Sequence, residues 1–369
     1  MKVFFTLFLP LTWLYQFLFW LSQGRKKTTV LPNALVISVG NITVGGTGKT
    51  PFVQYLVQYF QKTNKEYAIT ILSRGYKAKL SKRGAILPNG NSPNLYGDEP
   101  SEHKERFPSV QVIIGQNRIV SFSNHNQIQS KKHIVILDDG FQHNQIYRDF
   151  DIVLLDNNAP FGNGFTIPLG YLREPISHLK RANVIVFTKI TESNVKEFEK
   201  GKETLKQLGI QLPTFGSSFQ AEAYQIHLDT FEQTLIPNNT QMQDASTSDR
   251  YFLFTGVGNP HHVLETTIST LNTNQIQHSF FPDHYEFEEK VLLSLLDGKD
   301  EKTIFVTTEK DWVKVRTQNK FIEALKRKKI QLLVIRVDVV IKEQSVFESM
   351  LAHLVSTYEV KNGLVSKPS

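Results

Sequence analysis

The chain has 369 residues, 40% of them hydrophobic, which is long enough for two domains rather than one. It contains no cysteine, so disulfides and cysteine-ligated metal sites are excluded. The net charge of +7 fits general solubility or attraction to anionic lipid. The sequence contains no recognisable nucleic-acid-binding module, and we therefore expect no nucleic-acid partner.

The first predicted element is an apolar segment at the start of the chain. Val3–Leu21 comprises 19 residues without a charge, eight of them aromatic. A helix of this length would measure roughly 28 Å, close to the hydrocarbon thickness of a bilayer. A signal-peptide cleavage site is missing, and the cations Arg25, Lys26 and Lys27 follow. We therefore expect residues 1–27 to anchor the chain, spanning the bilayer or lying in one leaflet, with the rest on the cytoplasmic side.

A glycine-rich turn follows the strand-like run Ala34–Val39. Residues 40–51 read GNITVGGTGKTP, and a helix-like apolar pattern comes next. Glycines at a helix start let backbone N–H groups surround phosphate oxygens. Lys49 would reach the β- and γ-phosphates, and the Thr50 hydroxyl would coordinate Mg²⁺. Thr43 stands where the usual first glycine would be, which predicts a variant backbone path. The alternative is a flexible turn beside an ordinary lysine. The predicted nucleotide-binding residues of this loop are Gly45, Gly46, Thr47, Gly48, Lys49 and Thr50.

The remaining apolar runs predict an α/β chain in two parts. Runs in the first part are continuous rather than alternating, as in strands buried on both faces of a parallel sheet. We expect a kinase-like domain over residues 28–215, a linker and polar loop over 216–250, and a smaller α/β domain over 251–360. The expected strands are Ala34–Val39, Tyr67–Leu72, Val110–Ile114, Ile134–Leu137, Ile152–Leu155, Val184–Phe187, Tyr251–Thr255, Ile276–Phe280, Thr303–Val306 and Leu332–Val337. Helices are expected at Glu192–Leu208, closing the first part, and at Gln344–Ser356, capping the second.

Two carboxylates follow the run Ile134–Leu137. Asp138 and Asp139 resemble the acidic end of a Walker B strand, which holds Mg²⁺ opposite the P-loop hydroxyl. The alternative is a simple Asp-Gly turn. His143 could contact phosphate or could be a polar loop residue. After the last strand of the first part, Thr191 stands where a guanine-reading aspartate would be needed, so we expect ATP rather than GTP.

Short motifs along the chain resemble, in their order, the tetraacyldisaccharide 4′-kinase family, the membrane-associated enzymes that phosphorylate the lipid A disaccharide in Gram-negative bacteria. The resemblance covers nearly the full length, and the variant loop with Thr43 is expected in this family. The motifs are SVGN at 38–41, GGTGKTP at 45–51, SRGY at 73–76, GDEP at 97–100, LDDGFQH at 137–143, REP at 173–175, GVGNP at 256–260, DHY at 283–285 and TEKD at 308–311.

The resemblance implies a fold and a reaction. It implies an α/β, P-loop NTPase-like core with a parallel sheet, a second, smaller α/β domain, and an N-terminal hydrophobic membrane helix. It implies ATP and Mg²⁺ as cosubstrates. The γ-phosphate would pass to the 4′-hydroxyl of tetraacyldisaccharide 1-phosphate, an acylated glucosamine disaccharide lipid, giving lipid IVA at the bacterial inner membrane. We expect the protein to act as a monomer.

Candidate catalytic residues come from the need to deprotonate a sugar hydroxyl, for which a carboxylate or imidazole must accept the proton. Spacing alone favours Asp98 and Glu99 as a helix cap and first-turn acid. The resemblance instead implies that Asp98 pairs with His284 of the second domain as an Asp–His dyad. For Glu99, a role at Mg²⁺ and simple capping both stay open.

Three arginines complete the candidate list. Arg74 follows a strand end, where a guanidinium could hold phosphate. Arg118 and Arg173 are weaker candidates from the residues alone, since exposed arginines are usually solvated. The Arg-Glu-Pro match makes Arg173 a candidate for the 1-phosphate of the substrate. Two other classes of function stay open: a membrane-tethered P-loop ATPase without a sugar-lipid substrate, and a non-catalytic nucleotide sensor.

Overall fold

The computed structural model describes residues 28–237, 251–273 and 276–364. The predicted anchor over residues 1–27 and most of the polar loop before Tyr251 lie outside this range. Among the residues described, no helix is both long enough and apolar enough to cross a membrane.

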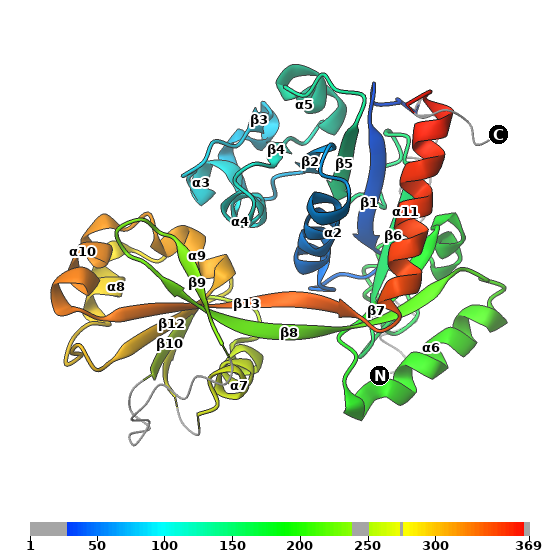
Figure 1. Cartoon of the computed structure of the whole chain (residues 1–369). Coiled ribbons are helices and arrows are strands. Elements are labelled where there is room, and N and C mark those ends of the chain that lie inside the picture. The colour runs from blue at the N-terminus through cyan, green and yellow to red at the C-terminus, as the bar shows by residue number, and fades with distance from the viewer. Residues whose placement is uncertain (1–27, 238–250, 274–275, 365–369) are drawn as a thin grey trace.

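One sheet runs through the whole molecule and joins its two halves (Figure 1). Its strand order is β11-β10-β12-β13-β8-β7-β6-β1-β5-β2-β4-β3, and β9 pairs with β8. The first half is parallel apart from β3, as its continuous apolar runs predict. Its strands are β1 (Leu35–Asn41), β2 (Ala68–Ser73), β3 (Ala85–Ile86), β4 (Gln111–Ile114), β5 (His133–Asp138), β6 (Phe150–Asp156) and β7 (Val184–Thr188).

The second half continues the same sheet through two long strands. β8 (Thr214–Ile226) begins parallel to β7 and then runs antiparallel to β13 (Gln331–Ile341) over ten residue pairs. Figure 1 shows this two-stranded ribbon extending from one half to the other. Part of the expected linker is therefore a strand of the sheet. The other strands are β9 (Gln233–Ile236), β10 (Tyr251–Thr255), β11 (Gln277–Phe280) and β12 (Ile304–Thr308).

Helices cover both faces of this sheet. The predicted helix at Glu192–Leu208 is confirmed as a 3₁₀ turn, η3 (Glu192–Asn194), followed by α6 (Val195–Gln207). Two further 3₁₀ turns are η1 (Lys79–Lys82) and η2 (Ile176–Arg181). The other helices are α2 (Lys49–Thr63), α3 (Pro93–Tyr96), α4 (Asp98–Arg106), α5 (Arg118–His125), α7 (Pro260–Leu271), α8 (Glu289–Ser294), α9 (Glu309–Val315), α10 (Asn319–Lys328) and α11 (Gln344–Lys361).

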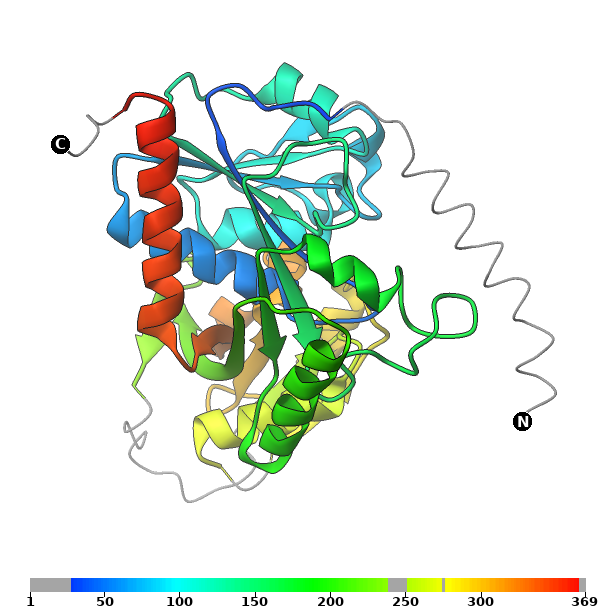
Figure 2. The same ribbon diagram turned by 90° about the vertical axis from the view of Figure 1, so that its right-hand side faces the viewer.

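The expectation that the last helix caps the second half is wrong. α11 packs in the core of the first half, where Phe347 lies edge-on to Phe52 of α2 and to Phe215 of β8, with ring centroids 5.9 and 5.3 Å apart. The reason is the length of β13, which carries the chain back along β8 before the helix starts. Figures 1 and 2 both show α11 beside the first half.

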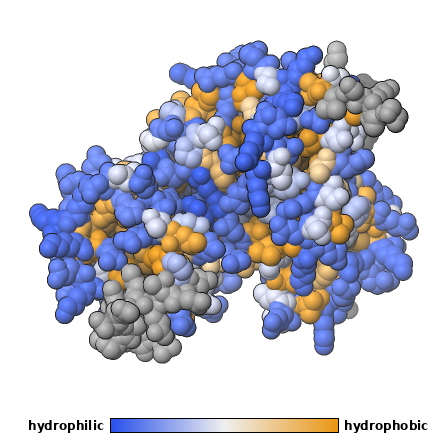
Figure 3. Space-filling model, in the orientation of Figure 1, coloured by the Kyte–Doolittle hydropathy of each residue, from blue (hydrophilic) through white to orange (hydrophobic). Residues whose placement is uncertain are grey.

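On the face in Figure 3, polar residues cover most of the surface, and hydrophobic areas are scattered among them. Inside, β1 is buried along its full length, because helices cover both of its faces. Burying side chains such as Phe52 and Phe60, which are fully enclosed, contributes roughly 2 to 3 kcal/mol each. This rigid strand and the helix after it hold the glycine-rich loop between them.

Candidate active site

The glycine-rich loop connects β1 to α2 and ends at Gly48. Gly48 has φ 82° and ψ 27°, a left-handed conformation, and a Cβ there would lie 2.6 Å from the ring of Phe219. Both facts require glycine at this position. Gly45 and Gly46 are exposed, and a Cβ on either would meet no atom of the described chain within 4 Å. The loop therefore presents open backbone at the start of a helix, where phosphate binds well.

The last residue of β7, Thr188, and the residue after it, Lys189, support this loop. The Thr188 hydroxyl donates to the carbonyl of Thr47 at 2.9 Å, and Lys189 Nζ donates to the carbonyl of Gly46 at 2.6 Å. Lys189 also pairs with Asp156. The sequence of this segment predicts only that the nucleotide is not GTP. The loop support was missed, because nothing in the sequence pattern pairs residue 189 with residue 46.

Lys49 and Arg173 converge on Asp139. Lys49 Nζ lies 3.5 Å from Asp139 Oδ1, and Arg173 donates to both carboxylate oxygens at 3.0 and 2.9 Å. Partial burial opposes ionisation of Asp139, but the charges of Lys49, Arg173 and Arg118 outweigh it and lower its pKa. The predicted P-loop lysine and the second predicted Walker B carboxylate thus face each other at the carboxyl edge of the sheet.

Asp138 lies deeper, at the end of β5. It is 2% exposed, and its Oδ2 accepts a hydrogen bond from Ser73 at 3.2 Å. Its Oδ1 is buried and has no hydrogen-bond partner among the described residues. A buried carboxylate oxygen without a partner is costly, and a cation ligand would satisfy it. The Oδ1 atom of Asp138 is therefore available as a ligand for a metal ion.

The predicted metal-binding residues do not by themselves supply all the ligands of a metal ion. Within residues 28–237, 251–273 and 276–364, no three His, Cys, Asp or Glu side chains lie close enough to hold a metal ion. Mg²⁺ usually keeps several waters and takes one or two carboxylates plus phosphate oxygens, so this arrangement suits it.

Glu99 lies in the first turn of α4, and part of its surface is open to solvent. Desolvation and the neighbouring Asp138 carboxylate raise the pKa of Glu99 to about 7, while Lys49 opposes the shift. A carboxyl in this state takes up a proton readily unless a cation is nearby. The charge of Asp138 therefore acts on Glu99.

Arg118, Arg74 and His143 surround the same turn. Arg118 is 4% exposed and donates to the carbonyl of Asp138 and, at 3.2 Å, to that of Asp139. It therefore supports the Asp138–Asp139 turn in this structure. Burial lowers the pKa of the Arg118 guanidinium, against the charges of Asp139 and Asp138, and the charge of Arg74, which is exposed just beyond β2, lowers it further. His143 is half-buried, and its carbonyl accepts a hydrogen bond from Arg148 at 2.8 Å.

Asp98 and His284 come together across the two halves. Asp98 Oδ2 lies 2.8 Å from His284 Nδ1, within hydrogen-bond distance, although the residues are 186 positions apart. The His284 backbone adopts φ 63° and its N–H donates to the carbonyl of Gly256 at 3.1 Å. Lys314 Nζ on α9 lies 2.7 Å from the same Asp98 oxygen. Because Lys314 can only donate, Asp98 accepts both bonds and His284 Nδ1 carries the proton.

The TEKD motif begins α9 as a helix start. The Thr308 hydroxyl accepts from the backbone N–H of Asp311 at 3.2 Å, and buried Asp311 in turn accepts from Thr255 at 2.7 Å. These contacts show that the threonine and the aspartate of the motif stabilise the start of a helix. Lys310 and Lys314 on the same helix were missed, because lysine on a helix surface is usually solvated.

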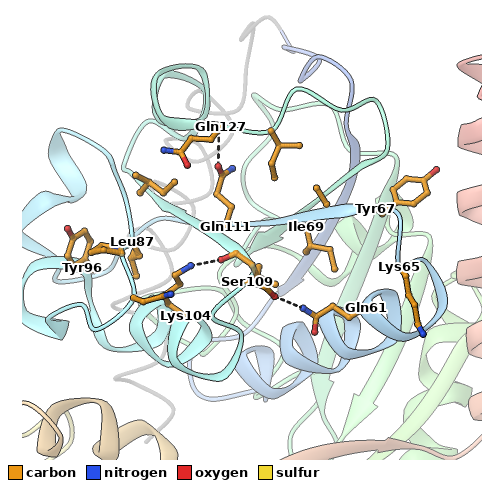
Figure 4. Close-up of a pocket in the computed structure, with 16 residues that line it drawn as sticks. Gln61, Lys65, Tyr67, Ile69, Leu87, Tyr96, Lys104, Ser109, Gln111 and Gln127 are labelled. Carbon is orange, nitrogen blue, oxygen red and sulfur yellow. Dashed lines mark hydrogen bonds between the residues drawn. The ribbon is translucent and has the colours of Figure 1, made fainter. Parts of the chain in front are cut away.

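A cavity of about 920 Å³ lies away from this site (Figure 4). It opens at the amino-terminal ends of β2 and β4, near Tyr67 and Gln111, and beside the last turn of α2. The P-loop is at the first turn of the same helix, roughly 20 Å away at 1.5 Å per residue. The cavity is thus at the opposite edge of the sheet.

Comparison with known proteins decides the family. Residues 4–356 match the family model described as LpxK, tetraacyldisaccharide-1-P 4′-kinase. The chain belongs to this family. It is 63% identical over 372 residues to the tetraacyldisaccharide 4′-kinase of Leptospira biflexa, covering 99% of this chain and 100% of that one. It is 33% identical to the enzyme of the same name from Flavobacterium psychrophilum, covering 84% of this chain and 87% of the relative.

A solved LpxK structure has the same fold. The crystal structure of LpxK from Aquifex aeolicus in complex with ATP superposes with a TM-score of 0.67 at 26% identity, covering 95% of this chain and 99% of that one. The mixed sheet of this LpxK-family chain is therefore shared with that enzyme. The predicted family and the α/β core are both confirmed.

Proposed function

We propose that this chain transfers the γ-phosphate of ATP to the 4′-hydroxyl of tetraacyldisaccharide 1-phosphate, giving lipid IVA. The observation that carries the proposal is the Asp98–His284 hydrogen bond of 2.8 Å, which pairs a carboxylate with a candidate proton acceptor. Asp98 is next to Glu99, on which the charge of Lys49 acts. Family membership supports the substrate, and the Aquifex aeolicus neighbour in complex with ATP supports the nucleotide.

The phosphate end of the site would be built from the loop. Backbone N–H groups of Gly45, Gly46, Thr47 and Gly48 would surround the β- and γ-phosphates at the N-terminus of α2. Lys49 pairs with Asp139 at 3.5 Å in this structure. With ATP bound, it would instead contact the phosphoryl group that is transferred.

The metal would lie beside the buried end of β5. We assign Mg²⁺ to Thr50, Asp138 and Asp139, with Glu99 as a ligand or a hydrogen-bond partner of bound water. The unpartnered Oδ1 of Asp138 is the feature of the structure that supports this assignment. Bound Mg²⁺ would neutralise charge on the phosphate oxygens.

The proton acceptor would be His284. With Nδ1 donating to Asp98, Nε2 keeps a lone pair for the 4′-hydroxyl. As the hydroxyl oxygen bonds to the γ-phosphorus, the bond from phosphorus to the ADP oxygen breaks and the hydroxyl proton passes to Nε2. Asp98 orients the ring and stabilises the imidazolium that forms, and Lys314 holds Asp98 in place.

The anionic 1-phosphate of the lipid would be held by cations near the Asp138–Asp139 turn. Arg173, which pairs with Asp139, can exchange this carboxylate for the 1-phosphate. Arg74, exposed just beyond β2, would instead hold a phosphate of ATP. His143 and Arg118 would also belong to the site of the 1-phosphate, with Arg118 acting through the turn that it supports. We further propose that residues 1–27 bind the bacterial inner membrane, with the catalytic halves on its cytoplasmic face, and that the protein acts as a monomer.

The test is the dependence of ATP consumption on lipid. Purified full-length protein with ATP and Mg²⁺ should form ADP only when an acylated glucosamine disaccharide 1-phosphate is supplied in detergent. An equal rate of ADP formation without lipid would instead indicate a membrane-tethered ATPase. Nucleotide binding without any ADP formation in the presence of lipid would indicate a sensor.

A further inference from the structure

A second carboxylate lies beside the imidazole of His284, near the nitrogen that Asp98 does not contact. Asp283 Oδ2 is 3.8 Å from His284 Nε2, whereas Asp98 Oδ2 is 2.8 Å from Nδ1. A separation of 3.8 Å is too long for a hydrogen bond. Rotation of the half-exposed Asp283 side chain would bring the two groups within hydrogen-bond distance unless another contact holds the carboxylate.

Lys310 is in the position to do so. Its Nζ lies 2.8 Å from the other Asp283 oxygen, Oδ1, and its side chain is only 24% exposed. Lys310 and Lys314 are four residues apart on α9 and therefore lie on one face of the helix. Lys310 pairs with Asp283, the carboxylate on the Nε2 side of the ring, and Lys314 pairs with Asp98, the carboxylate on the Nδ1 side.

The consequence follows from imidazole chemistry. If Asp283 accepted a hydrogen bond from Nε2, both ring nitrogens would face carboxylates and the doubly protonated imidazolium would be stabilised. An imidazolium has no lone pair with which to accept a proton. We propose that Lys310 is a positioning residue that keeps Asp283 off His284 Nε2 and so leaves this nitrogen free for the sugar hydroxyl. This inference rests on the function proposed above.

The charged and titratable groups facing His284 come from three segments. α4 contributes Asp98, with Glu99 next to it in the chain, and α9 contributes Lys310 and Lys314. The loop of His284 itself contributes Asp283 and Tyr285, whose carbonyl accepts from Lys314 at 3.1 Å. Lys310 also opposes the raised pKa of Glu99, after the larger effects of burial, Asp138 and Lys49. A test must therefore separate an effect through Asp283 from one through Glu99.

A rescue experiment makes that separation. Lys310→Met should lower kcat with saturating lipid by about tenfold, with less than about a twofold change in KM for ATP, because general-base catalysis contributes at least that much. Lys310→Met combined with Asp283→Asn should recover most of the loss, because the amide is not a competing anion. Lys310→Arg should keep most of the activity. A double variant as slow as Lys310→Met, or a Lys310→Met enzyme with normal kcat, would overturn the proposal.

A second measurement requires no turnover. Full-length protein labelled with ¹⁵N-histidine gives the protonation state of both ring nitrogens, and His284→Gln identifies the signals of His284. At pH 7.5 the wild type should show a proton on Nδ1 alone. Lys310→Met should show the doubly protonated ring, and the added Asp283→Asn should remove it. An unchanged His284 spectrum in Lys310→Met would reject the inference even if the kinase activity is established, and the expected spectra would support it even if the lipid is not the substrate.

Discussion

At the scale of single residues, the charge of Lys49 has the clearest predicted effect. Lys49→Ala should reduce turnover by two or more orders of magnitude while the protein stays folded, because the ammonium acts mainly on the transferring phosphoryl group. The matched control is Lys62→Ala, at the exposed far end of the same helix, which should keep the wild-type rate. The measurement is ADP formation with lipid substrate, with circular dichroism to check folding. Near-normal rates in folded Lys49→Ala would refute the P-loop assignment.

The Asp98–His284 contact predicts strong coupling between two substitutions. Asp98→Ala and His284→Ala should each lower kcat strongly with a modest change in KM for ATP. The double variant should be little slower than the slower single variant, because the two side chains act as one unit. A double-mutant cycle on kcat with lipid substrate measures this coupling. Losses that multiply in full would show that the residues act separately.

How far the sequence predicts the site differs from residue to residue. The P-loop and the Asp138–Asp139 turn follow from local order, because a strand, a turn and a helix start are adjacent in the chain. The pairing of Asp98 with His284 was available only from family resemblance. The sequence does not predict the roles of Lys314 and Lys310. Their partners depend on how α9 packs against α4 and against the loop that carries His284.

At the scale of elements, α4 carries a buried acid whose pKa the fold raises. Glu102 is 9% exposed, and burial, followed by the carboxylate of Glu309, raises its pKa to about 8, against a hydrogen bond from Gln54 of 2.9 Å. Arg106 on the same helix pairs with Glu309 on α9 at 3.4 Å. Buried charges therefore join the two halves directly behind the catalytic end of α4.

The raised pKa of Glu102 predicts a pH-dependent stability. An unfolded glutamate loses its proton near pH 4.5 and the folded one near pH 8, so the free energy of unfolding falls as the pH rises between these values. Glu102→Gln removes this loss and should stabilise the protein increasingly from pH 5 to pH 8, by on the order of a few kcal/mol at the upper end. Thermal unfolding across this range measures it. Glu203→Gln, on the exposed face of α6, is the control and should follow the wild type. A Glu102→Gln effect that does not change with pH would contradict the assignment.

The sequence predicts strands correctly where both faces of the strand are buried. β1, β5, β6 and β7 are enclosed on both faces, so their apolar runs are visible in the sequence. β8 mixes buried and half-exposed residues and includes Gly216, and its partner β13 is more than a hundred residues away. Its role as the strand that joins the halves was therefore not predictable, and the same long pairing explains the misplaced α11.

At the scale of the whole molecule, the two halves should bind ATP without the apolar start of the chain, but they should need it for turnover of the lipid. Deleting residues 1–23 should leave ATP binding intact, because β1 begins at Leu35 and the sheet is complete without them. Turnover of lipid in membranes or detergent should fall more than nucleotide affinity does. Calorimetric titration with an ATP analogue and a lipid kinase assay measure the two quantities. Loss of ATP binding by a folded deletion variant would show that the segment is not a separate anchor.

The central claim is that the Asp98–His284 pair and the P-loop act on one sugar hydroxyl. The most direct measurement is the structure of the product formed from [γ-¹⁸O]ATP and tetraacyldisaccharide 1-phosphate, by mass spectrometry and ³¹P–¹H NMR. The account predicts a bisphosphorylated lipid whose new, ¹⁸O-labelled phosphate is coupled to the proton at carbon 4′, and almost none of this product with His284→Ala. A phosphate on another position, or labelled inorganic phosphate with unmodified lipid, would contradict it.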